Sequence, residues 1–86
     1  MHLSAMRFTW QPWNTAHVAR HGLTPAETEA LFTASDFVVS TVPGEIRHVG
    51  RGTVSRHTYR VVFIREANGD LYVITCHREH PDRRFP

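Results

Sequence analysis

The strongest constraint on the fold is a predicted β-hairpin near the C-terminal end of the sequence. Residues 59–64 are rich in β-branched and aromatic side chains, Asn68-Gly69 is a favoured two-residue hairpin turn, and residues 71–76 supply the returning strand. A turn of two residues fixes the register, because it assigns each strand residue a partner on the opposite strand. This register places Arg60 directly opposite His77.

Two short helices are predicted in the first half of the chain. Pro12 suits the first turn of a helix, where its missing N–H is not needed, and residues 13–21 continue that helix until Gly22 ends it. The second helix begins with a capping box, in which Thr24 is the cap and Glu27 completes the box. It extends to about residue 33.

The other strands are predicted at residues 6–10, 37–39 and 46–49, whereas the glycine-containing stretch 50–55 is predicted to be a loop. The order of elements is therefore β-α-α-β-β-β-β. A run of strands after two helices predicts an α+β fold, with the two N-terminal helices packed on one face of a small, mainly antiparallel sheet. The opposite face of that sheet is then partly open to a ligand.

The length of 86 residues predicts a single domain that spans residues 1–86. The single cysteine, Cys76, rules out an internal disulfide bond, and we expect a buried apolar residue rather than a nucleophile. The N-terminal residues lack the long apolar core of a signal peptide, and no stretch approaches the ~20 apolar residues that span a bilayer. We therefore expect a cytoplasmic protein without a membrane partner.

All ten basic residues are arginines, and most of them lie in the second half of the chain. Arginine stays charged and binds phosphate through planar, bidentate hydrogen bonds, and seven histidines add groups that titrate near neutral pH. The resulting positive field favours RNA as a partner. A compositional bias toward arginine explains the same excess without any function, so composition alone does not establish RNA binding.

The predicted hairpin gathers basic side chains at one of its ends. These are Arg56, His57, Arg60, His77, Arg78 and His80. RNA cleavage by its own 2′-hydroxyl needs a base for that hydroxyl, an acid for the leaving 5′-oxygen, and positive charge beside the phosphorane. Histidine and arginine supply these functions. The alternative is a solvated hairpin end whose arginines only maintain solubility.

Two further groups of residues have more than one interpretation. His17 and His21 have the spacing of a metal-binding pair on a helix, but no HExxH or Cys-x-x-Cys motif adds further ligands, and we expect neither a metal nor another cofactor. The aromatic residues Phe8, Trp10 and Trp13 are able to stack on bases, but core packing is the expected role.

A set of residues spread over the chain matches a known pattern. Its first half contains Phe8-Thr9-Trp10, Asn14, the run from His17 to Thr24, Glu27, Glu29 and Phe32, and its second half contains Arg47, Gly50-Arg51, Val61-Val62-Phe63, Val73-Ile74-Thr75 and Arg83-Arg84. From about Met6 to Phe85 the sequence thereby resembles the BrnT toxins, most specifically at the His21-Gly22 corner and the helix after it.

The resemblance implies a RelE-like fold and a type II toxin, a ribonuclease that cleaves RNA without a metal ion and inhibits translation. It also implies a cognate ribbon-helix-helix antitoxin in a toxin–antitoxin hetero-oligomer, with a homodimer as the other expected assembly. We predict that the catalytic residues are His57, Arg60 and His77. The residues predicted to bind the RNA backbone are Arg56, Arg78 and Arg83, with Arg47 and His21 added by the family pattern.

Two positions depart from that pattern. BrnT-like chains have Gly-Arg before the first hairpin strand, where this chain has Ser55-Arg56 or Arg56-His57, and they have Ala-Arg where this chain has Cys76-His77. Neighbouring residues in a strand point to opposite faces, so an arginine next to the expected position does not replace it. Either the chemistry relies on histidine, or the chain is an inactive relative, a non-catalytic module that binds RNA or protein.

Overall fold

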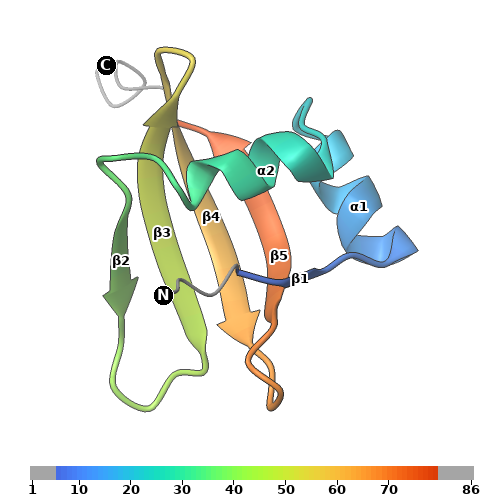
Figure 1. Ribbon diagram of the computed structural model, residues 1–86, viewed down its shortest axis with the longest axis vertical. Helices are drawn as coiled ribbons and strands as arrows, with labels where there is room; N and C mark the ends of the chain where they lie inside the picture. Colours follow the sequence, from blue (N-terminus) through green and yellow to red (C-terminus); the bar gives the residue numbers. More distant parts are fainter. Residues whose placement is uncertain (1–5, 80–86) are drawn as a thin grey trace, which may run out of the picture.

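The computed structural model describes residues 6–79, which form two helices and a five-stranded sheet (Figure 1). In chain order the elements are β1 (Phe8–Thr9), α1 (Pro12–Ala19), α2 (Pro25–Leu31), β2 (Val38–Thr41), β3 (Arg47–Val54), β4 (His57–Arg65) and β5 (Leu71–Arg78). The spatial order of the strands is β1-β5-β4-β3-β2. All pairs are antiparallel except β1 with β5. The predicted α+β fold, with a mainly antiparallel sheet, is confirmed.

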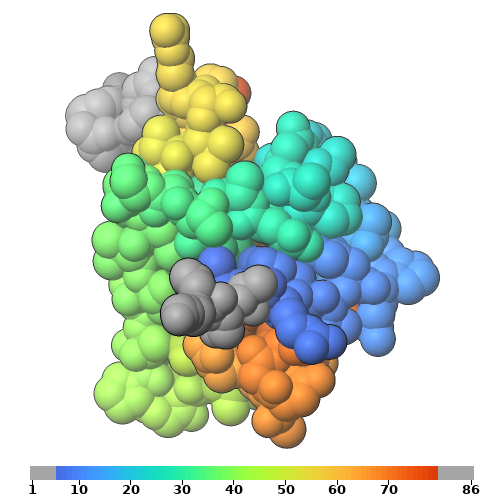
Figure 2. All heavy atoms as spheres, viewed as in Figure 1, coloured from blue at the N-terminus to red at the C-terminus, as the bar shows by residue number. Residues whose placement is uncertain are grey.

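Both helices pack on the same face of the sheet. In the space-filling view, the helices and the chain around β1 lie in front of the central strands (Figure 2). Between the layers lie Val18 and Leu31 from the helices, and Val61 and Val73 from β4 and β5, all at most 1% exposed. Burying one such side chain contributes roughly 1.5–3 kcal/mol, so this layer provides the main stabilisation of the domain.

The opposite side of the sheet is called the uncovered face, because neither helix packs on it. Side chains alternate between the two faces along a strand, so residues between the buried ones point to the uncovered face. They are Val49, Arg51 and Thr53 of β3, Thr58, Arg60, Val62 and Ile64 of β4, and Tyr72, Thr75 and His77 of β5.

The side chain of Asn14, which is fully buried, ties α1 to the edge of the sheet. Its Nδ2 donates to the carbonyl oxygens of Thr9 (2.9 Å) and Val73 (3.0 Å), and its Oδ1 accepts from the Gln11 N–H at 2.7 Å. β1 pairs with β5 only at Leu71 and Tyr72. The amide therefore bonds the backbone where that pairing ends.

Strand β3 corrects the prediction of a loop at residues 50–55. It runs through both glycines to Val54, and Gly50 and Gly52 are buried. A Cβ atom at Gly50 would overlap the ring of Phe37, and one at Gly52 would lie 3.3 Å from Leu31 and Phe37. The glycines thus leave room for neighbouring side chains to pack directly on the strand backbone, which is a known reason for glycine within a strand.

The turn between β4 and β5 is longer than predicted. The Glu66 N–H donates to the Asp70 oxygen and the Gly69 N–H to the Glu66 oxygen, with Gly69 at φ +92°, as in a three-residue loop. Farther along, Val62 pairs with Thr75 and Phe63 with Val73, so β5 has one extra residue there.

This bulge restores the predicted register, although the predicted two-residue turn is wrong. The longer turn shifts the strands by one residue and the bulge shifts them back. Beyond it Arg60 pairs with His77 and Tyr59 with Arg78, as the sequence predicts.

The turn between β3 and β4 holds two residues, Ser55 and Arg56, at φ +52° and +71°. Both values lie in the left-handed region, which costs a residue other than glycine about 1–3 kcal/mol. Hairpin turns of this type favour Asn-Gly.

Replacing the buried amide of Asn14 by its closest isostere, aspartate, should destabilise the protein. Asn14→Asp retains an acceptor for Gln11 but loses both donors and buries a carboxylate, so we expect the free energy of unfolding to fall by at least about 3 kcal/mol in urea. Asn68→Asp, in the exposed turn, is the matched control; it loses one hydrogen bond to the Asp70 carboxylate and should change the free energy of unfolding by about 1 kcal/mol or less. Equal losses in both variants would contradict the role of Asn14.

Relieving the strain in the β3–β4 turn should stabilise the protein. The variant Ser55→Asn/Arg56→Gly is expected to raise the free energy of unfolding by about 1 kcal/mol, since both new residues tolerate positive φ. Ser55→Asn/Arg56→Ala removes the same charge and keeps an alanine in the strained position. No difference between the two variants in urea denaturation would show that the turn is not strained.

Candidate functional site

Three basic side chains form a row across the uncovered face. Arg51 on β3 is the cross-strand partner of Arg60 on β4, and Arg60 is the partner of His77 on β5. Directly opposed like charges destabilise a sheet by roughly 0.2–1 kcal/mol per pair. The pair of Arg51 and Arg60 thus has an energetic cost, which is the kind of departure from local stability that functional sites show.

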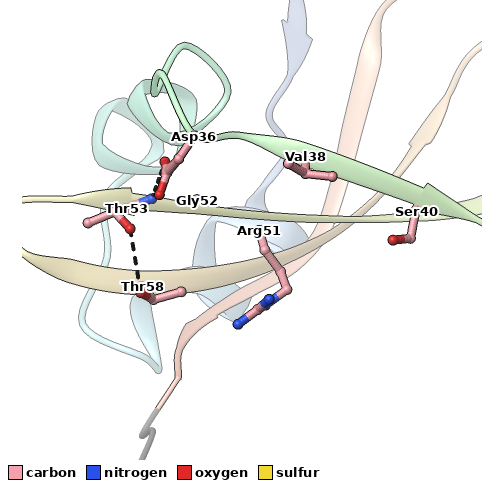
Figure 3. A pocket seen from close by; sticks show the side chains of 7 residues that line it. All are labelled: Asp36, Val38, Ser40, Arg51, Gly52, Thr53 and Thr58. Atoms are coloured by element: carbon pink, nitrogen blue, oxygen red, sulfur yellow. Dashed lines mark hydrogen bonds between the residues drawn. The ribbon is translucent and has the colours of Figure 1, made fainter.

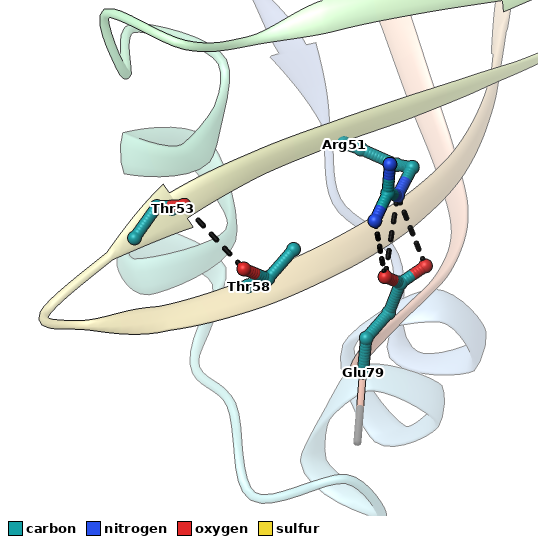
Figure 4. Close-up of polar contacts among 4 residues, drawn as sticks. All are labelled: Arg51, Thr53, Thr58 and Glu79. Carbon is teal, nitrogen blue, oxygen red and sulfur yellow. Dashed lines mark hydrogen bonds and ion pairs between the residues drawn. The ribbon is translucent and has the colours of Figure 1, made fainter. Parts of the chain in front are cut away.

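Glu79, one residue beyond the end of β5, lies against this row (Figure 4). Arg51 donates from Nε to both carboxylate oxygens (3.2 and 3.1 Å) and from Nη2 to Oε1 (2.7 Å). The Glu79 N–H donates to the Thr58 oxygen at 2.8 Å, which holds the chain beside β4. The carboxylate partly neutralises the row at its Arg51 end.

The environment of Glu79 lowers the pKa of its carboxyl group. The main cause is the hydrogen bond from Arg51, and the positive charges of Arg51, Arg60 and His77 add to it. The same contact raises the pKa of Arg51. Both groups are therefore charged at neutral pH.

Arg60 occupies the middle of the row. It is exposed, and among residues 6–79 no carboxylate forms an ion pair with it. Its guanidinium is consequently available to an external anion. A planar guanidinium binds phosphate through two parallel hydrogen bonds.

A line of aromatic rings along the β5 edge approaches the basic row at His77. The His21 ring, just after α1, lies 5.6 Å from that of His77 between centroids. Trp13 contacts His17 at 4.9 Å and stacks on Tyr72 at 6.5 Å. The Trp13 ring of α1 and the His21 ring just after this helix thus both lie beside β5.

The expected core role holds for two of the three N-terminal aromatic residues. Phe8 and Trp10 pack against the core, and the Trp10 indole N–H donates to Glu29 at 2.8 Å. Trp13 contradicts the expectation, since it is 56% exposed. Because the core under α1 is filled by Val18 and Asn14, this indole is left at the surface.

The structure separates His57 from the other two predicted catalytic residues. His57 pairs with Val54 and its ring contacts Tyr59 at 6.5 Å, on the face that carries the helices. Arg60 and His77 share the uncovered face. The expectation that all three lie together is wrong, because His57 and Arg60 are an odd number of residues apart in one strand.

The predicted RNA-binding residues are also divided. Arg78 pairs with Tyr59 and so points to the helix side, and Arg56 lies in the strained turn. Arg47 is at the far end of β3, where its Nη2 lies 3.3 Å from Glu45 Oε1. His21 is beside His77, whereas Arg83, like His80, falls outside the described residues.

Sequence reasoning missed Arg51 and Glu79 as members of the site. Arg51 was hidden by the prediction of a loop at residues 50–55. If Ser55-Arg56 is recognised as a two-residue hairpin turn, Arg51 falls opposite Arg60 by counting alone. Glu79 carries no such signal, because its contact with Arg51 spans the strand between them.

Cys76 is buried, as expected, at 1% exposure. Burial raises the pKa of its thiol to about 12, with a smaller opposing effect of a hydrogen bond to Thr28. The thiol is therefore protonated at neutral pH and poorly nucleophilic. Within the described residues, no three histidine, cysteine or acidic side chains are arranged to hold a metal ion.

A polar pocket adjoins the Arg51 end of the row. It has a volume of about 270 Å³ (Figure 3). Its lining residues are Asp36, Val38, Ser40, Arg51, Gly52, Thr53 and Thr58. Because Arg51 belongs to both features, the pocket and the basic row form one continuous surface.

Comparisons with models of protein families, with curated proteins and with solved structures found no match to this chain. In the described part of the chain, neither helix has the length and apolar character needed to cross a bilayer. The basis for assigning a function is therefore the geometry of the uncovered face.

The ion pair of Glu79 should make stability depend on pH in the acidic range. Its pKa is lower in the folded chain than in the unfolded chain, where it is about 4.3. The contribution is thus present above that value and is lost as the pH falls through the folded pKa. At pH 7 Glu79→Gln should lower the free energy of unfolding by about 1 kcal/mol or less. The difference from the parent should shrink as the pH falls below about 4.3 and should vanish once the pH is below the folded pKa.

Glu45→Gln is the matched control for that measurement. Glu45 contacts Arg47 through one oxygen and its side chain is 46% exposed, against 24% for Glu79. Its replacement should have a smaller effect in urea denaturation. A loss in Glu79→Gln that does not diminish as the pH is lowered from 7 through the acidic range would contradict the assignment to this ion pair.

Proposed function

We propose that this protein is a cytoplasmic ribonuclease toxin of a type II toxin–antitoxin system, which cleaves RNA on the uncovered face and is neutralised by a ribbon-helix-helix antitoxin. The observation that carries the proposal is the row of Arg51, Arg60 and His77 side by side across three strands. The resemblance to BrnT toxins supplies the antitoxin and the inhibition of translation. The row supplies the chemistry.

The proposed reaction begins with attack of the RNA 2′-oxygen on the adjacent phosphorus. His77 takes the proton of the 2′-hydroxyl, a bond forms between that oxygen and phosphorus, and the bond to the 5′-oxygen breaks. His21, whose ring lies 5.6 Å from that of His77, gives a proton to the leaving 5′-oxygen. The products are a 2′,3′-cyclic phosphate and a 5′-hydroxyl. Histidine suits both steps because it exchanges protons near neutral pH.

Arg60 is proposed to stabilise the phosphorane. Its position next to His77 places a guanidinium at the phosphate whose 2′-hydroxyl is deprotonated. Preorganised charge of this kind is worth about 10²–10³-fold in rate. Arg51 contributes positive charge beside the neighbouring phosphate, and its hydrogen bonds to Glu79 fix the orientation of the guanidinium.

The test uses purified protein, unlabelled cellular RNA and two matched pairs of variants. Arg60→Ala and His77→Ala should each slow cleavage about 10²-fold or more, while activity persists in EDTA. Arg65→Ala, at the other end of β4, and His57→Ala, on the other face, should stay within a few-fold of the parent. Induction in cells should give toxicity that follows the same order.

Two results would refute the proposed ribonuclease function. One is a parent chain that neither cleaves RNA nor slows growth. The other is equal cleavage by the parent and an Arg60→Ala, His77→Ala double variant, since both proposed groups are then dispensable.

A second candidate is a non-catalytic module of the same fold that binds RNA or a protein. It is favoured by exposed apolar residues along the sheet edge at β2 and after it, namely Val38, Val39, Val42 and Ile46. An edge strand with apolar neighbours is a surface for pairing with another chain. Binding of uncleaved RNA that weakens steeply with salt would favour this candidate over the ribonuclease.

A further inference from the structure

The pocket beside Arg51 forms where the chain arrives from α2 and β2 begins. Val38 is the first residue of β2 and pairs with Arg51, so both point to the uncovered face. Before it, Asp36 turns its carboxylate toward β3 and accepts the Thr53 N–H at 2.9 Å. The carboxylate thus accepts a hydrogen bond that a backbone carbonyl would accept in a longer strand. A polar recess opens beside it, between the two strands (Figure 3).

Asp36 supplies hydrogen-bond acceptors to this recess. Hydrogen bonds from the Thr53 side chain and backbone lower its pKa, so the carboxylate is ionised at neutral pH. An ionised carboxylate has about four acceptor positions, and Thr53 engages only part of them. The side chain is exposed, which leaves the remaining positions accessible to a ligand.

Arg51 supplies donors on the other side of the recess. Its Nε and Nη2 are engaged by Glu79, which leaves N–H groups on Nη1. Arg51 and Thr53 are two residues apart on β3, a separation of about 7 Å. Hydroxyl groups of Ser40, Thr53 and Thr58 lie around the recess, and Thr53 and Thr58 face each other at 3.5 Å between oxygens.

This arrangement suits a flat ligand that has two adjacent donors on one edge and two acceptors on the next. Guanine has these groups, with N1–H and N2–H₂ beside O6 and N7. The other three RNA bases lack an adjacent pair of donors of this kind. Carboxylates accept from base amino groups, and arginine donates to O6 and N7 of guanine. A volume of about 270 Å³ accommodates one base.

We propose that the pocket is a subsite for a guanine base of single-stranded RNA, in which Asp36 accepts from the Watson–Crick edge and Arg51 donates to the acceptor edge. This inference rests on the proposed ribonuclease and makes Asp36 its specificity-determining residue. β3 and β5 are two strand spacings apart, about 10 Å. The guanine in the pocket therefore belongs to a nucleotide next to the phosphate that lies at Arg60 and His77.

The first test measures binding without cleavage. The probes are 2′-O-methyl uridine oligonucleotides with one central guanosine, adenosine or inosine, in which the blocked 2′-oxygen prevents the reaction. The parent chain should bind the guanosine probe roughly tenfold more tightly than the adenosine probe. Inosine lacks the 2-amino group and should fall between them. Equal affinity for all three probes overturns the proposal.

The second test uses Asp36→Asn. The asparagine oxygen still accepts the Thr53 N–H, so the strand contact is retained while the other oxygen becomes a donor. Preference for guanosine should drop to about twofold or less, whereas Glu45→Gln, with the same charge change elsewhere, should keep the parental preference. Thermal unfolding of each variant checks that the fold is intact. Guanosine preference that survives in folded Asp36→Asn refutes the role of Asp36.

The outcomes separate this proposal from the proposed ribonuclease. A chain that selects the guanosine probe through Asp36 but cleaves no RNA refutes the ribonuclease and supports the base pocket. A chain that cleaves natural RNA at sites without guanine in a fixed neighbouring position supports the ribonuclease and refutes the pocket.

Discussion

The amide of Asn14 is the interaction on which the arrangement of the layers depends. It is fully buried and satisfies three backbone groups, one from the end of β1, one from the segment that joins β1 to α1 and one from β5. These bonds attach the helix layer to the β5 edge. Toward the β2 edge of the sheet, on the same face, Gly50 lets the ring of Phe37 lie on β3 and close the helix layer. With both ends held on one face, the opposite face is left to the charged side chains.

The uncovered face combines an electrostatic cost with a partial remedy. Arg51 and Arg60 are placed directly opposite each other, with His77 beside Arg60, although opposed like charges weaken strand pairing. Glu79 offsets part of that repulsion, yet it engages Arg51 at the end of the row and not Arg60 in the middle. An anion such as an RNA phosphate would complete the balance. Because its carboxylate offsets repulsion among the basic side chains, Glu79 contributes to stability as well as to the site.

The sequence predicted much of the fold because its signals are local. The capping box at Thr24 and Glu27 is formed, and α2 begins directly after the cap at Pro25. The opposition of Arg60 and His77 was also predicted, but through a turn that differs from the real one. That result came from two compensating shifts, the longer turn and the bulge, neither of which has a clear signature in the residue pattern. A register derived from a turn type is thus less secure than a cap derived from adjacent residues.

The sequence by itself determined the element order, the helix starts and the concentration of arginine in the second half, since these depend on neighbouring residues and on composition. Tertiary structure alone decided which basic side chains share a face. It separated His57 from His77, brought His21 from the helix layer to the β5 edge, and joined Arg51 to Glu79 across a strand. The physical reason is that these relations depend on pairing and packing between distant segments, where a shift of one residue exchanges the two faces of a strand.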